Sequence, residues 1–279
     1  MIDQAGLLRK MAWAKNRKSV YISVASGKGG VGKTNFAVNL AYQLVKRGKK
    51  VLLFDADLGL ANVDVILNIA PIKTIKDYFL NNAKIEEIVI KNVKGFDVFP
   101  ASSGFLELTH IETEVFDKIL DMFVLLDESY DYIIFDTAAG IAENVLRFII
   151  FSDLFIVITL PEPTAITDAY ALVKVVHNKN KNITPHFVIN MVKGEVQAET
   201  VYENLRKVIY NFLKKDIELL GFIRRDDKLV KAVTRQKILS EIFPSTEYAK
   251  DLRMIVDNVL RFNDKNRSIN VEEFFVMRG

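Results

Sequence analysis

The stretch GKGGVGKT, residues 27–34, constrains the fold of this chain more than any other feature of its sequence. It has the pattern G-x-x-x-x-G-K-T and lies between a run typical of a strand, at 19–25, and a run typical of a helix, at 33–47. In that context glycines let backbone N–H groups converge on phosphate oxygens, and the helix directs its positive end at the same point. We therefore predict a phosphate-binding loop made of Gly27, Lys28, Gly29, Gly30, Val31, Gly32, Lys33, Thr34 and Asn35.

The rest of the chain alternates between short apolar runs and amphipathic stretches. This alternation is typical of an α/β protein, and continuous apolar runs such as DYIIFDT suit strands that are covered on both faces. We predict a mostly parallel central sheet flanked by helices on both faces. The predicted strands are 19–25, 50–55, 96–100, 131–136, 154–160, 185–190 and 217–223, and the predicted helices are 33–47, 112–127, 141–151, 164–178, 196–214 and 245–262.

Composition excludes several classes of site. The 279 residues contain no cysteine, which excludes disulfides, thiolate zinc sites and iron–sulfur clusters and agrees with a cytoplasmic protein. The three histidines are far apart in sequence, so we expect no histidine metal site. A net charge of +3 is too small to indicate a nucleic-acid partner. The most apolar region, 145–160, is interrupted by charged residues, and we expect it to be buried protein.

Polar side chains at the ends of predicted strands complete the candidate site. Asp55 and Asp57 follow the second strand and Asp136 follows the fourth, at the edge where open α/β sheets place their ligands. Lys33 can reach the β- and γ-phosphates, the Thr34 hydroxyl can ligate Mg²⁺, and Asp136 can hold the ion directly or through water. Asn190 ends the sixth strand, and its amide matches the N6/N7 pair of adenine.

Lys28 is a second lysine in a loop that needs only one. The sequence KGGVGKT resembles the deviant Walker A motif of the MinD/ParA family of ATPases, which have the P-loop NTPase fold of the SIMIBI type. The resemblance implies an ATPase with ATP or ADP and Mg²⁺ as cofactors. It also implies that Lys28 crosses an ATP-dependent homodimer to the partner's phosphates, that Asp57 orients the attacking water, that Asp55 supports the metal region, and that Asn190 contacts adenine.

Two further stretches resemble flagellar-number regulators of the FlhG type, also called FleN or YlxH. The segment DQAGLLR resembles the N-terminal segment with which that group engages the GTPase FlhF, and Asn35 and GLANVD also resemble this group. We therefore predict a partner-binding arm and tether at 1–18 and an ATPase domain at 19–265. The arm residues predicted to bind an FlhF-type GTPase are Asp3, Gln4, Ala5, Leu7, Leu8 and Arg9.

The C-terminal tail, 266–279, is predicted as a partial membrane-targeting helix. Val271, Phe274 and Phe275 can share one helical face, although Glu272 and Glu273 oppose anionic lipid, and packing of the tail against the domain is the alternative. With this contact, the protein is expected in the cytoplasm and peripherally at the inner face of the cell membrane.

Two other functions are left open by the sequence. One is a ParA-like partition ATPase that binds DNA through the basic residues of 224–237, although a solvated helix with its flanks shows the same charges. The other is a MinD-like ATPase that positions the division site. Arg224 and Arg225 stand where the family usually has a proline after the last strand, which leaves the adenine contacts near 223–227 undefined.

Overall fold

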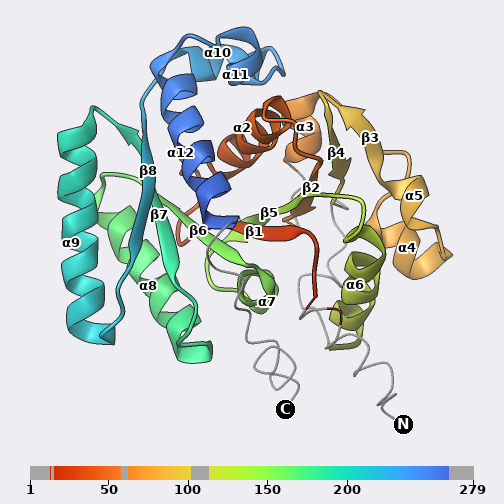
Figure 1. Ribbon diagram of the computed structural model, residues 1–279, viewed down its shortest axis with the longest axis horizontal. Helices are drawn as coiled ribbons and strands as arrows, with labels where there is room; N and C mark the ends of the chain where they lie inside the picture. Colours follow the sequence, from red (N-terminus) through yellow and green to blue (C-terminus); the bar gives the residue numbers. More distant parts are fainter. Residues whose placement is uncertain (1–12, 14–15, 58–61, 102–112, 264–279) are drawn as a thin grey trace.

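A computed structural model describes residue 13 and residues 16–57, 62–101 and 113–263 of the chain (Figure 1). Its strands are β1 (Val20–Ser26), β2 (Val51–Ala56), β3 (Ile90–Val93), β4 (Phe96–Phe99), β5 (Tyr132–Ala139), β6 (Leu154–Thr159), β7 (Pro185–Val192) and β8 (Glu218–Arg224). They form one sheet in the order β3-β4-β2-β5-β1-β6-β7-β8. All neighbouring pairs are parallel except β3 and β4. The predicted fold class is therefore confirmed.

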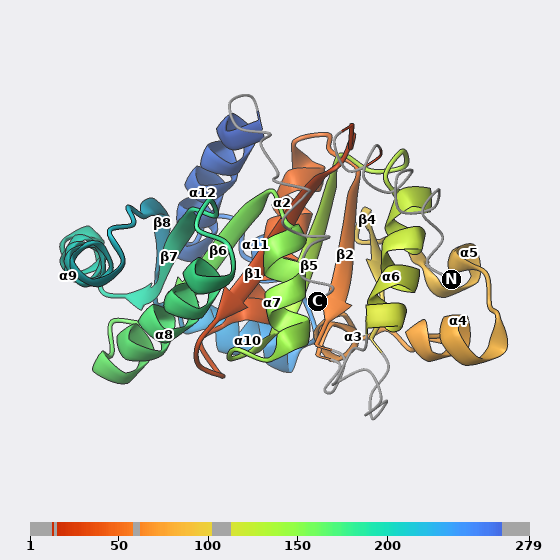
Figure 2. The same ribbon diagram turned by 90° about the horizontal axis from the view of Figure 1, so that it is seen from below.

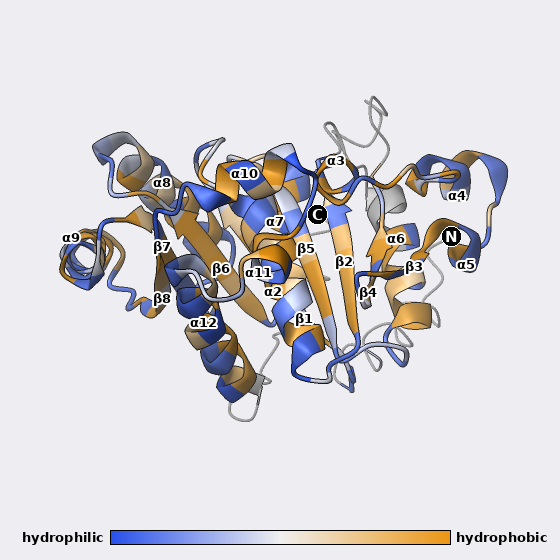
Figure 3. Cartoon of the chain, turned by 90° about the horizontal axis from the view of Figure 1, so that it is seen from above, coloured by the Kyte–Doolittle hydropathy of each residue, from blue (hydrophilic) through white to orange (hydrophobic). Residues whose placement is uncertain are grey.

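Helices cover both faces of this sheet (Figures 1 and 2). One face packs mainly against α2 and α12, and the other packs against α4 to α9. The strands β2, β5 and β6 are mostly hydrophobic, as Figure 3 shows, because both of their faces are buried. The helices are α2 (Lys33–Lys46), α3 (Val63–Leu67), α4 (Ile75–Asn81), α5 (Ile85–Ile88), α6 (Thr113–Leu126), α7 (Glu143–Phe151), α8 (Pro163–Lys179), α9 (Glu195–Leu213), α10 (Lys228–Thr234), α11 (Leu239–Ile242) and α12 (Glu247–Asn263).

All seven predicted strands and all six predicted helices are present, with ends that differ by at most three residues. The strand β3 and the short helices α3, α4, α5, α10 and α11 were not predicted from the sequence. These helices have four to seven residues, too few to show a helical period. The strand β3 has four residues at the sheet edge and none of them is fully buried, so it lacks the apolar run of the central strands.

The described end of the predicted arm packs against the domain. The ring of Trp13 stacks on Phe151, with 6.0 Å between centroids, and meets Tyr21 edge-on. Arg17 is buried, forms a 3.0 Å ion pair with Asp153 and donates to the Phe151 carbonyl. Trp13 and Arg17, both within the predicted arm and tether, therefore pack on the domain, and the burial of the guanidinium depends on these partners. The boundary at residue 18 stays a prediction.

The apolar region 145–160 forms most of α7 and all of β6, and its residues are buried as predicted, apart from partly exposed positions such as Arg147. Within the described ranges, no helix has both the length and the apolar character needed to cross a bilayer. The arm residues 3–9 and the tail at 266–279 lie outside the described residues, and the predictions on them stay predictions.

Candidate nucleotide site

The predicted phosphate-binding loop connects the carboxyl end of β1 to the first turn of α2. Gly30 and Gly32 have φ angles of 78° and 94°, in the left-handed region that side chains other than glycine rarely adopt. Gly27 is required for a different reason, since a Cβ there would lie 2.1 Å from the backbone oxygen of Asp168 in α8. The loop is thus held against α8 at Gly27, whereas a Cβ on Gly29 or Gly30 would meet nothing within 4 Å.

Gly27→Ala is expected to displace the loop from α8, because a methyl group cannot approach a backbone oxygen so closely. We expect ADP binding to weaken by at least about tenfold, which corresponds to about 1.4 kcal/mol. Titration calorimetry with ADP measures this loss. Gly194→Ala is the matched control, since a Cβ at Gly194 meets nothing within 4 Å, and it should bind ADP normally. Normal binding by Gly27→Ala would contradict the requirement for close packing.

Lys33 extends along the inside of the loop. Its Nζ donates a 3.0 Å hydrogen bond to the Ser26 hydroxyl, which itself donates to the Lys28 carbonyl at 2.7 Å. Burial lowers the pKa of Lys33, whereas the charges of Asp136 and Asp57 act in the opposite direction. A buried ammonium group between the loop and these carboxylates is suited to bind phosphate oxygens.

Asp55 and Asp136 are paired residues on the adjacent strands β2 and β5, and each is 1% exposed. Asp55 accepts hydrogen bonds from the backbone N–H groups of Asp57, Asn62 and Val63, at 3.2 to 3.3 Å. Burial, followed by the charge of Asp136, raises the pKa of Asp55, and these N–H groups oppose the increase. Asp55 therefore fixes both ends of the segment after β2. Its predicted support of the metal region stays a prediction.

Asp136 has a buried oxygen, Oδ1, without a hydrogen-bond partner among the described residues. Burial raises the pKa of Asp136 to about 7, whereas its hydrogen bond with Thr34 and the charge of Lys33 lower it and the charge of Asp57 raises it. A hydroxyl and an unpaired carboxylate oxygen are hard ligands of the kind that Mg²⁺ takes together with phosphate oxygens. Thr34 and Asp136 thus fit the predicted ion.

No group of three or more histidine or acidic side chains that could hold a metal occurs in the part of the chain that the structure describes. Mg²⁺ at Thr34 and Asp136 would therefore depend on phosphate oxygens of the nucleotide for further ligands. Asp57 lies one residue beyond β2, and its charge acts on both Lys33 and Asp136. The structure thus places the carboxylate of Asp57 in the same site, and its role toward water stays a prediction.

Asn190 fastens the loop to β7. Its Nδ2 donates to the Val31 carbonyl at 2.8 Å, and its Oδ1 accepts from the Met191 N–H at 2.9 Å. A Cβ on Gly32 would lie 2.6 Å from Nδ2, so the contact also needs a glycine in the loop. The amide has two N–H donors and two acceptor lone pairs, and these contacts use one of each. The remaining donor and lone pair could still bind adenine, and that contact stays a prediction.

Lys28 lies at the rim of the loop and contacts its own chain. Its Nζ is 3.3 Å from Glu162 Oε2 and 3.2 Å from the Thr164 hydroxyl, next to the start of α8. The side chains of the ion pair are 39% and 54% exposed, so the pair contributes at most about 1 kcal/mol. Lys28 can therefore change partners at little cost. Glu162, Thr164 and Ser26 were not predicted as site residues. Ser26 ends β1 and the other two follow β6, so their places at strand ends are the same kind of signal that indicated Asp136.

The basic stretch at 224–237 separates into two parts. Arg224 forms ion pairs with Asp251 and Glu247, which removes it from any free basic surface. The exposed basic residues are Arg225, Lys228, Lys231, Arg235 and Lys237. Most of them belong to α10 or its flanks, which agrees with the interpretation as a solvated helix.

The parallel sheet and the glycine-rich loop that opens α2, with lysine, threonine and aspartate beside it, define a P-loop nucleotide-binding protein. Residues 22–239 match the family model described as the CobQ/CobB/MinD/ParA nucleotide binding domain. The chain belongs to this family, and it is an ATPase of the MinD/ParA type.

The similar proteins include two flagellar ones. The antiactivator FleN of Pseudomonas aeruginosa is 34% identical over 258 residues, which cover 92% of each chain. The flagellum site-determining protein YlxH of Helicobacter pylori is 38% identical over 265 residues, covering 91% of this chain and 89% of the relative. MinD in the MinC:MinD cell division complex of Aquifex aeolicus has a TM-score of 0.69 and 28% identity, covering 87% of this chain and 96% of that chain. The resemblance to FlhG-type proteins is thus confirmed.

Proposed function

We propose that this chain is an ATP-dependent dimerisation switch that regulates flagellar number and placement through an FlhF-type GTPase. The observation that carries the proposal is the pair of lysines in one loop. Lys33 is buried between the loop and the carboxylates, whereas Lys28 is held at the rim by an exposed ion pair. One nucleotide needs only the first lysine, so the second is available to a partner's nucleotide. The flagellar relatives support the biological role.

Each side chain has a role in this proposal. Lys33 and the loop N–H groups bind the phosphates, and Thr34 and Asp136 hold Mg²⁺, which neutralises phosphate charge when bound. Asp57 accepts a hydrogen bond from the attacking water and orients it. Lys28 exchanges Glu162 and Thr164 for the phosphates of the second copy. ATP favours the dimer only because it binds the dimer more tightly than the monomer, and hydrolysis removes that preference.

Deletion of residues 1–12 tests the role of the arm. The deletion keeps Trp13 and Arg17, which pack on the domain, so we expect a folded protein with normal ATP hydrolysis. Stimulation of an FlhF-type GTPase should be lost, because the predicted contact residues are removed. Phosphate release from GTP measures the effect, and deletion of 264–279 is the control that should retain stimulation. Unchanged stimulation after the arm deletion would reject this partner.

A MinD-like role at the division site is the second candidate, favoured by the similarity to the MinD chain of the Aquifex complex. In that case the tail, and not the arm, would be the segment that determines where the protein binds. Loss of 264–279 would remove the protein from the membrane, and loss of the arm would have no effect on its function.

We also propose that the protein is cytoplasmic, with a peripheral membrane contact through the tail.

A further inference from the structure

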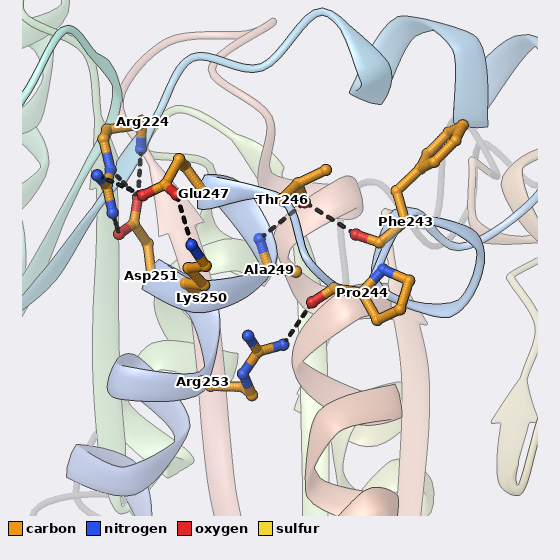
Figure 4. A network of polar contacts seen from close by, with 9 residues as sticks. All are labelled: Arg224, Phe243, Pro244, Thr246, Glu247, Ala249, Lys250, Asp251 and Arg253. Atoms are coloured by element: carbon orange, nitrogen blue, oxygen red, sulfur yellow. Dashed lines mark hydrogen bonds and ion pairs between the residues drawn. The ribbon is translucent and has the colours of Figure 1, made fainter.

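Arg224, which ends β8, is the centre of a polar network between β8 and α12 (Figure 4). Its backbone N–H and its Nε each donate a 2.9 Å hydrogen bond to Asp251 Oδ2. One terminal nitrogen of the guanidinium donates to Asp251 Oδ1, and the other pairs with Glu247. The arginine thus binds both oxygens of one carboxylate through its planar group and its main chain, an arrangement that lysine cannot reproduce.

Asp251 of α12 is fully buried, with 0% exposure. A buried carboxylate is costly unless it is paired, so removal of Arg224 would leave an uncompensated charge inside the protein. An apolar pair of similar volume would avoid this cost equally well. Stability alone therefore does not require an arginine at position 224. The fixed geometry of the Arg224–Asp251 contact needs another explanation.

The network acts on the end of the sheet that holds the nucleotide site. Arg224 pairs with Val192 of β7 across an irregular register, and the Arg225 N–H donates to the Val192 carbonyl at 3.0 Å. Between Val192 and Asn190 lies Met191, with a φ angle of 58° that is unfavourable for a methionine. Such a conformation persists only where the surroundings fix it. The end of β8 supplies these surroundings on one side of Val192.

Asn190 connects this irregular end of β7 to the phosphate loop. Its Oδ1 accepts from the Met191 N–H, so the amide is held by the peptide that leads into the irregular end of β7. The amide then donates to the Val31 carbonyl in the loop. A continuous set of contacts therefore runs from Asp251 through Arg224, Val192 and Asn190 to the loop.

We propose that Arg224 is a positioning residue for nucleotide binding, which fixes Asn190 and the phosphate loop through its bidentate contact with Asp251. The inference rests on the proposed nucleotide chemistry of the site and adds a residue that touches no nucleotide itself. It also gives a physical role to the arginine that ends β8.

The test uses the full chain and measures ADP affinity by calorimetry together with KM and kcat for ATP. Arg224→Ala should weaken ADP binding by about tenfold and raise KM by a similar factor, because the displaced loop binds the phosphates less well, while kcat per folded molecule falls by less, because Asp57 and Asp136 are not part of the loop. Arg224→Lys should give nearly the same loss, because it keeps the charge but not the bidentate geometry. Arg253→Ala is the matched control: its guanidinium donates to the Pro244 carbonyl and has no ion pair within the described ranges, so the variant should bind ADP normally.

A second variant separates positioning from folding. Arg224→Met combined with Asp251→Leu removes both charges, so the protein should fold and melt at or above the temperature of the unchanged chain. We still expect weakened ADP binding in this double variant, because the bidentate contact is missing. ADP affinity equal to that of the unchanged chain, in a folded Arg224→Ala or in the double variant, would overturn the proposal. Failure of the unchanged chain to bind ADP would instead reject the nucleotide chemistry of the site.

Discussion

Lys28→Ala should abolish the ATP-dependent dimer and leave nucleotide binding by the monomer nearly intact. The lysine contributes only an exposed ion pair with Glu162 to its own chain, so its removal costs the monomer little. In the dimer the same ammonium group would meet a partner's phosphates in a site closed to water. A cation supplied in trans in this way accelerates phosphoryl transfer by 10³-fold or more in arginine-finger systems, so hydrolysis should fall by about 10³-fold.

Light scattering with a non-hydrolysable ATP analogue measures the dimer, and calorimetry measures binding to the monomer. Lys181→Ala makes the same change of charge at an exposed lysine. This lysine precedes β7, at the amino ends of the parallel strands and opposite the phosphate loop, so the variant should dimerise normally. Glu162→Gln weakens the contact of Lys28 with its own chain and should favour the dimer by no more than about fivefold. An undiminished dimer in Lys28→Ala would refute the crossing lysine.

The central fold and most of this site follow from local sequence. The phosphate loop is defined by the spacing of residues 27–34, and Asp55 and Asp136 are found because the carboxyl ends of parallel strands share one edge. The long apolar strands and helices carry a clear period, so their ends are predicted within three residues. Each of these features depends on a short stretch of sequence, so it can be predicted without knowing the order of the strands in the sheet.

Contacts between distant segments could not be predicted in this way. Lys28 meets Glu162, 134 residues away, and Arg224 meets Asp251, 27 residues away. The sequence around a lysine or arginine does not indicate which acidic residue it will pair with. The ion pair forms only after the order of the strands and the packing of the helices bring the two segments together. The same limit applies to Asn190, whose residue type suggests a base contact and whose amide is also used to hold the loop.

Asp136→Asn should stabilise the nucleotide-free protein and abolish Mg²⁺-dependent hydrolysis. Burial raises the pKa of Asp136 from 3.8 to about 7, so the folded protein binds this proton more tightly than the unfolded chain. The ionised group therefore opposes folding increasingly as pH rises from about 4 to 7, and fully above pH 7. At about 1.4 kcal/mol per pKa unit the cost reaches at most about 4 kcal/mol, and part of it belongs to the coupled pair with Asp55.

Melting temperatures at pH 5.5 and 8.5, without Mg²⁺, measure this effect. Asp136→Asn should melt several degrees above the unchanged chain at pH 8.5, at about 2–4 °C per kcal/mol, and by roughly half as much above it at pH 5.5, where the unfolded chain is already ionised while the folded Asp136 is mostly protonated. Asp97→Asn is the control, with the opposite effect expected on stability. Burial alone would raise the pKa of Asp97, but hydrogen bonds from Asn92, Tyr130 and Lys91 lower it. The ionised group therefore stabilises the fold, and this variant should be destabilised at both pH values. Equal shifts for Asp136→Asn at the two pH values would contradict an ionised carboxylate held buried for a cation.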